Sequence, residues 1–124
     1  MNIILVAAIL GALAVLIGAF GAHGLEQTAI SEKALKSYHT GVEYQFYHVF
    51  ALLFVGLLYL HRPSILLMYA AWSFIIGIVL FSGSLYTYVL TGTRQFAMIT
   101  PIGGLTLVSA WVLLAVATFR SSSQ

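Results

Sequence analysis

The chain has 124 residues, of which 61% are hydrophobic and only 6% are charged, with a formal net charge of +2 at pH 7. A soluble domain carries about one quarter charged residues, whereas here the apolar residues form long uncharged blocks, so the composition excludes an ordinary soluble protein and indicates a membrane protein. The lack of cysteine excludes disulfides and thiolate chemistry, and five basic residues spread along the chain give little support to nucleic-acid binding.

The first apolar block predicts a transmembrane helix over residues 2–22, where no side chain is charged. Small residues near Ala22 resemble a signal-peptide cleavage site. However, no basic side chain precedes the block, and the block is longer than a usual signal core. We therefore expect a retained first span.

The connection that follows, residues 24–40, is the polar stretch of the chain. Its apolar residues recur at helical spacing: Ile30, Ala34, Leu35 and Tyr38. Ser31 is a suitable N-cap, and Glu32 and Lys36 form a favourable pair four residues apart. This pattern predicts an amphipathic helix that lies in the membrane interface or runs straight into the second span. The alternative is an ordered loop anchored by its apolar face.

Three further blocks predict spans over residues 41–60, 64–90 and 96–119. Each approaches or exceeds the roughly 20 residues that cross a hydrocarbon core of about 30 Å. The block at 41–60 is interrupted by a carboxylate and an imidazole, those of Glu43 and His48. These two groups make the second span the unusual one.

The connections are too short to hold a soluble domain, so residues 1–124 are expected to form a single four-span membrane domain, an all-α four-helix bundle. An even number of spans puts both termini on one side of the membrane, here called side A. The first and third connections lie on the opposite side, side B. Three Lys or Arg residues fall on side B and two on side A, so the positive-inside rule does not orient the chain.

Polar and small residues of all four predicted spans fall at a similar depth, roughly 10 Å in from side B at the rise of an α-helix. The polar candidates for a layer at this depth are His23, His39, Glu43, Tyr44, Tyr47, His48, Ser82, Ser84, Tyr86 and Thr100. The residues expected to let the helices approach closely are Gly18, Gly21, Gly83, Pro101, Gly103 and Gly104. The other half of each span is mostly aliphatic, so we predict one polar layer in one leaflet.

Within this layer, His48 carries the deepest imidazole, and an ionisable side chain inside a membrane normally faces protein or water. We expect a neutral ring that donates one hydrogen to a neighbouring serine, tyrosine or backbone carbonyl. The candidate side-chain partners are Ser82, Ser84, Tyr86 and Thr100. Glu43 lies within a turn of the interface and is expected to reach water or Lys36.

Two interpretations of the layer stay open: a packed layer without a ligand, and the lining of a small cavity with a binding or conduction role. A metal site is not expected, because His48 points about 140° away from Glu43 on an ideal helix. A serine of the layer with His48 and Glu43 has the residue types of a nucleophilic triad, but the turn that presents such a nucleophile is missing. No catalytic residue and no cofactor are therefore assigned.

Four motifs occur in order: GAFGAHGL at 18–25, EYQFYH at 43–48, FSGSLY at 81–86 and TPIGG at 100–104, followed by Trp111. Together they resemble the small membrane proteins described as domain of unknown function 423, a family related to transmembrane protein 256 of animals. The resemblance spans nearly the whole chain and implies a multi-pass, four-span protein of the bacterial inner (plasma) membrane, without a settled activity. The family pattern more often has an uncharged residue at the position of Glu43. That departure shifts attention to His23, Tyr44, Tyr47 and His48.

The function favoured by these observations is a non-catalytic membrane component that self-associates or joins a larger complex and holds a lipid or small amphiphile at the polar layer. Its expected partners are membrane lipids and a further copy or another membrane protein, not nucleic acid. The alternative is an oligomeric permeation protein for protons or a small solute, with His48 as a relay. The side A half offers few polar residues to line such a route: Ser73, Thr106 and Ser109. A membrane enzyme that acts on a lipid is the third hypothesis.

Overall fold

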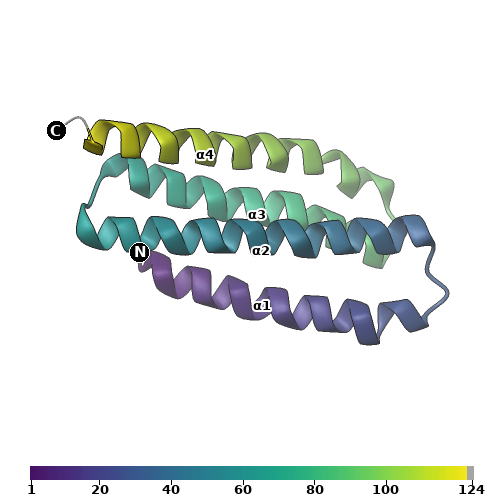
Figure 1. Ribbon diagram of the computed structural model, residues 1–124. Coiled ribbons are helices and arrows are strands. Elements are labelled where there is room, and N and C mark those ends of the chain that lie inside the picture. Colours follow the sequence, from purple (N-terminus) through teal and green to yellow (C-terminus); the bar gives the residue numbers. More distant parts are fainter. Residues whose placement is uncertain (123–124) are drawn as a thin grey trace.

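The computed structural model describes residues 1–122, which form long helices joined by short connections (Figure 1). In chain order the elements are α1 (Ile3–His23), η1 (Leu25–Gln27), α2 (Glu32–His61), α3 (Ile65–Thr91), η2 (Arg94–Met98) and α4 (Thr100–Ser122), where η marks a short 3-10 helix. Within these residues, four helices are long and apolar enough to cross a membrane. The predicted all-α architecture with four membrane helices is confirmed.

Polar side chains define where the helices begin. Asn2 Oδ1 accepts the N–H of Leu5 at 3.0 Å and so caps α1. Ser31 Oγ accepts the N–H of Ala34 at 3.1 Å in α2, as its sequence position predicts. At the other end of α3, Gly92 has a φ of 71°, a left-handed conformation that glycine adopts without steric cost and that ends the helix.

The segment between the first two spans runs straight into the second span. Residues from Glu32 onward belong to the same continuous helix as His61, so the amphipathic turns are the beginning of α2. Tyr38 anchors them, because its ring is buried and its hydroxyl donates to the carbonyl of Ile17 in α1 at 2.5 Å. The alternative of an ordered loop is therefore wrong for this part of the segment.

Consecutive helices pack side by side: α1 along α2, α2 along α3, and α3 along α4. The start of α1, the end of α4 and the α2–α3 connection lie at one end of the bundle, which is side A, and the other two connections lie at side B (Figure 1). The helix α1 buries the smallest share of its residues among the four. It is therefore the most peripheral helix, and α2, α3 and α4 supply most of the core, with Ile3 and Ala7 of α1 packed against them.

The apolar core occupies the centre and the side A half of the bundle. Its fully buried members include Leu52, Val55, Ala70, Ala71, Phe74 and Ala110. Small residues make the close packing possible: a Cβ at Gly77 would come within 2.5 Å of the Leu107 side chain. A smaller cluster near side B contains Leu25, Tyr38 and Val89.

Candidate functional site

Hydroxyl groups connect α2, α3 and α4 near side B. Ser82 Oγ of α3 donates to the carbonyl of Gly41 in α2 at 2.6 Å. Ser84 Oγ and Thr100 Oγ1 lie 2.6 Å apart and join α3 to the start of α4. These contacts link three helices at one level, as the converging polar residues predict.

A second chain of hydrogen bonds extends this level to α1. Tyr86 OH donates to Gln45 Oε1 at 2.7 Å, and Gln45 Nε2 donates to the carbonyl of Leu10 at 2.9 Å. Gln45 is only 3% exposed. Here we define the polar layer of the structure as Gln45, Ser82, Ser84, Tyr86 and Thr100.

Gln45 is a central member of this layer that the sequence prediction missed. It lies in the EYQFYH motif, four residues after Gly41 and three before His48, and all three positions are buried. A glutamine at this spacing on the buried face of a span is a strong signal, because an amide in a membrane requires hydrogen-bond partners.

The polar side chains of the layer pair with one another and with backbone carbonyls. Among the described residues, every fully buried side-chain nitrogen or oxygen has a hydrogen-bond partner. A shallow apolar groove of about 280 Å³ lies beside the layer, where Tyr38 and Tyr86 meet Leu16, Phe20 and Leu90. The layer therefore satisfies its hydrogen bonds internally, and a groove lies on its outer surface.

The glycines near this layer differ in what they contact. A Cβ at Gly103 would collide with the backbone of Phe81, and one at Gly21 would lie 2.5 Å from the Tyr38 ring. A Cβ at Gly18 would lie 3.3 Å from Val42, and one at Gly104 would make ordinary contact with Phe81.

Two residues of the predicted packing set lie outside the helix contacts. A Cβ at Gly83 would meet nothing within 4 Å, so its assignment to a helix contact is wrong. Gly83 is flanked by Ser82 and Ser84, which point to two neighbouring helices, so the residue between them points outward. Pro101 is also exposed, in the first turn of α4. Gly41, Gly56 and Gly77 are close-contact positions that the sequence prediction omitted.

The ring of His48 lies apart from the polar layer. It is 7% exposed, and its Nδ1 donates to the carbonyl of Tyr44, one turn earlier in the same helix, at 2.7 Å. The partner is thus a backbone carbonyl, one of the three expected kinds of acceptor. The more specific prediction of a side-chain partner is wrong for all four candidates: Ser82, Ser84, Tyr86 and Thr100. His48 lies seven residues beyond Gly41, so it is roughly 10 Å deeper along α2. A single level for all the polar groups is therefore wrong.

The tautomer that this bond requires leaves the second ring nitrogen as an acceptor. Because Nδ1 carries the hydrogen, Nε2 of the neutral ring has a lone pair. No described residue donates to Nε2. Since no fully buried side-chain atom lacks a partner in the described chain, Nε2 reaches the protein surface.

Around His48, rings from three helices form a continuous cluster. The His48 centroid lies 5.9 Å from Tyr44, 6.0 Å from Phe74 and 5.9 Å from Trp111. Tyr44 also stacks on Phe81 at 4.5 Å and lies 5.8 Å from Tyr47. We call these six residues, Tyr44, Tyr47, His48, Phe74, Phe81 and Trp111, the aromatic face.

Three residues of the aromatic face are exposed on the protein surface. Tyr44, Tyr47 and Trp111 are 39%, 56% and 46% exposed. Among the described residues, none accepts a hydrogen bond from their hydroxyl or indole groups. The face therefore combines hydrogen-bond donors with the acceptor Nε2 of His48 at membrane depth.

The other predicted site residues are dispersed. His39 Nε2 lies 3.1 Å from Glu26 Oε1 in a surface pair, while His23 and Glu43 are exposed. Within the described residues, Glu43 forms no ion pair with Lys36. The same part of the chain contains no group of three His, Cys, Asp or Glu residues that could hold a metal ion.

Comparison with known proteins identifies relatives of the whole chain. The family model described as "Protein of unknown function (DUF423)" matches residues 17–104. The UPF0382 membrane protein SH2409 of Staphylococcus haemolyticus is 42% identical over 116 residues, which cover 90% of this chain and 93% of the relative. The UPF0382 membrane protein YwdK of Bacillus subtilis is 42% identical over 118 residues, covering 94% and 95% of the two chains.

A third relative has a stated location. The UPF0382 inner membrane protein YgdD of Escherichia coli is 39% identical over 114 residues, which cover 92% of this chain and 86% of the relative. No solved structure matches the chain.

Proposed function

The chain belongs to the DUF423 (UPF0382) family of multi-pass membrane proteins, and from this premise we propose that it is a non-catalytic membrane component that associates with a second copy of itself through the aromatic face. The observation that carries the proposal is the imidazole of His48. It is 7% exposed, yet its Nε2 acceptor has no donor in the described chain and reaches the surface.

A bilayer interior makes this arrangement unfavourable for an isolated copy. Polar groups that face hydrocarbon without a partner cost free energy, because no water is present to replace the missing hydrogen bond. Interhelical hydrogen bonds in membranes contribute about 1–2 kcal/mol in model peptides. A complex in which a partner donates a hydrogen bond to Nε2 is therefore more stable than an isolated copy whose Nε2 faces lipid.

The chemistry of the face favours a second copy as this partner. It holds an acceptor on His48 and donors on Tyr44, Tyr47 and Trp111, and all four side chains lie in one ring cluster. A two-fold axis brings the donors of one copy to the acceptor of the other and the reverse, so a face that carries both is self-complementary. Exposed tyrosine and tryptophan rings add apolar contact area to the same interface.

Lipid contact is proposed for the groove beside the polar layer. The groove of about 280 Å³ has walls from Leu16, Phe20 and Leu90 and is almost entirely apolar. An acyl chain matches such a surface, whereas a headgroup does not. The lipid of this proposal therefore lies against the outside of the polar layer, because the inside is occupied by hydrogen-bonded side chains.

The geometry gives less support to catalysis and to permeation. Ser82 and Ser84 are bonded to Gly41 and Thr100 and lie at a different depth from His48. Thr106 and Ser109 donate to carbonyls of their own helix, those of Ile102 and Leu105. None of these groups forms a polar route with the imidazole, as a relay requires.

Self-association in liposomes tests the proposal. Copies labelled with donor and acceptor fluorophores are diluted with lipid, and the dimer constant is obtained from energy transfer. His48→Phe keeps an aromatic ring but removes the acceptor, so the dimer constant is expected to fall about 5–30-fold. Trp72→Phe is the matched control, because Trp72 is 49% exposed on α3 and makes no ring contact with the aromatic face. A monomeric wild type, or equal effects of the two substitutions, contradicts the proposal.

A further inference from the structure

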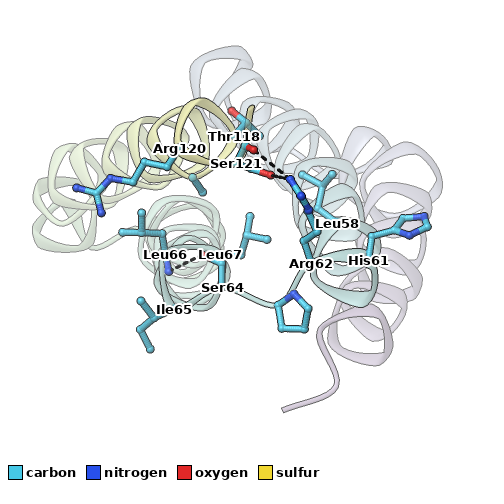
Figure 2. A pocket seen from close by; sticks show the side chains of 12 residues that line it. Leu58, His61, Arg62, Ser64, Ile65, Leu66, Leu67, Thr118, Arg120 and Ser121 are labelled. Atoms are coloured by element: carbon cyan, nitrogen blue, oxygen red, sulfur yellow. Dashed lines mark hydrogen bonds between the residues drawn. The ribbon is translucent and has the colours of Figure 1, made fainter. Parts of the chain in front are cut away.

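A pocket lies at the opposite end of the bundle from the polar layer. It has a volume of about 550 Å³ and is lined by the end of α2, the start of α3 and the last turns of α4. Figure 2 shows Arg62 reaching from the α2–α3 connection toward Thr118 and Ser121 of α4. The start of α1 and the end of α4 lie at this side (Figure 1), so the pocket is at the side A end of the membrane helices, where lipid headgroups are expected.

The walls of this pocket combine positive charge, hydroxyl groups and apolar side chains. Arg62 and Arg120 supply the charge, and Ser64, Thr118 and Ser121 supply the hydroxyls. Leucine and isoleucine side chains from the start of α3 form the apolar part, together with Leu58. In Figure 2, Arg120 and His61 extend outward on opposite sides, so Arg62 is the arginine that faces the space between the helices.

The charge of Arg62 has only neutral acceptors among the described residues. Its Nη1 donates to the carbonyl of Ser121 at 3.0 Å and to the Ser121 hydroxyl at 2.7 Å. The other guanidinium donors have no acceptor within residues 1–122. All three acidic side chains of the protein precede residue 44 and belong to side B or to the side B half of α2, so none of them neutralises this end.

The start of α3 adds to the attraction for an anion. Ser64 Oγ accepts the N–H of Leu66 at 3.2 Å, and the first turn of a helix of this length carries partial positive charge. A guanidinium presents paired N–H groups that match a phosphate. The apolar side chains then extend the same surface toward the hydrocarbon region.

We propose that this pocket binds the phosphate headgroup of an anionic phospholipid, with Arg62 as the headgroup ligand and the α3 side of the pocket in contact with the first part of an acyl chain. The lipid would also connect the ends of α2 and α4, which Arg62 and Ser121 already join. This site is independent of the aromatic face, which lies on other residues at another depth.

Native mass spectrometry of the delipidated protein tests this proposal. The protein is titrated with phosphatidylglycerol and with phosphatidylcholine of the same acyl chains. Phosphatidylglycerol is expected to bind more tightly, and Arg62→Gln is expected to reduce that preference about fivefold, the effect of one basic charge at an anionic membrane surface. Arg94→Gln is the matched control, because Arg94 is the basic residue of the α3–α4 connection on side B.

Two further measurements separate a headgroup ligand from a structural arginine. Ser121→Ala removes the hydroxyl acceptor of Arg62 but keeps the charge, so it should retain the lipid preference. Loss of both lipids in Arg62→Gln would show that Arg62 only holds the helices together, and would overturn the proposal. Equal binding of the two lipids in the wild type, or displacement of phosphatidylglycerol by millimolar inorganic phosphate, would overturn it as well.

Discussion

The polar layer and the aromatic face are both built by α2, α3 and α4, yet they differ in whether their polar atoms find hydrogen-bond partners on neighbouring helices. In the layer, Gln45, Ser82 and Tyr86 meet partners on neighbouring helices within the same chain. The aromatic face extends from the level of the layer, at Tyr44 and Phe81, to His48, about 10 Å beyond Gly41 along α2. Its rings pack on one another, while Nε2 of His48 has no donor in the described residues. The comparison indicates that the layer holds the bundle together and that the face is available to a partner.

The largest expected effect on stability comes from substituting a glycine that lies in a helix contact, compared with a glycine that faces outward. Gly103→Leu places a side chain against the backbone of Phe81, which cannot move away without separating α3 from α4. We expect a loss of about 3 kcal/mol in the free energy of unfolding. Titration with SDS in mixed micelles, followed by circular dichroism, measures this loss. Gly83→Leu is the control and should leave the unfolding curve unchanged, because a Cβ there meets nothing within 4 Å.

Removing the ring of His48 tests how much the aromatic face contributes to packing within one copy. His48→Ala leaves a space between Phe74 and Trp111 and should lower the free energy of unfolding by about 2 kcal/mol. His61→Ala, at the exposed end of α2, should have almost no effect in the same SDS titration. Equal losses for the two variants would show that the ring does not contribute to the core.

Removal of hydrogen bonds in the polar layer should lower the free energy of unfolding more than removal of the acceptor on the aromatic face. Gln45→Leu removes the acceptor of Tyr86 and the donor to Leu10, so unfolding should become easier by about 1–2 kcal/mol. His48→Phe, which preserves a ring, should change the unfolding of the isolated copy by less than about 1 kcal/mol. The distinction between the two regions fails if His48→Phe destabilises the monomer as strongly as Gln45→Leu.

The smallest effect is expected at Glu43. Its side chain is exposed and forms no ion pair within the described part of the chain, so Glu43→Gln should change the free energy of unfolding by no more than about 0.5 kcal/mol. A larger loss in the SDS titration would place the carboxylate in a buried pair. It would also extend the polar layer toward side B.

The number of membrane helices and most of the polar layer could be predicted because both depend on position along the chain. Uncharged blocks of sufficient length define the spans, and depth alone brings Ser82, Ser84 and Thr100 to one level. Rotation of each helix about its axis depends on packing between side chains distant in sequence. For this reason the sequence prediction assigned Gly83 to a helix contact, although the residue points outward.

The same limit explains the partners of His48. Helical spacing correctly separates the directions of His48 and Glu43, but it does not say which ring of α3 or α4 lies opposite. Phe74 and Trp111 belong to the mostly aliphatic half of their spans, and nothing in their sequence positions pairs them with an imidazole. The pocket at Arg62 was also missed, because it is formed by a short connection and the end of α4, which are distant in sequence.

Cross-linking through a single introduced cysteine tests the central claim most directly. The chain contains no cysteine of its own, so Tyr47→Cys places one thiol on the aromatic face, and Ile76→Cys places one on an exposed part of α3 outside that face. In bacterial membranes treated with a mild oxidant, Tyr47→Cys is expected to form a disulfide-linked dimer, and Ile76→Cys is expected to remain monomeric. A monomeric Tyr47→Cys protein, or equal dimer yields from the two positions, would contradict association through the aromatic face.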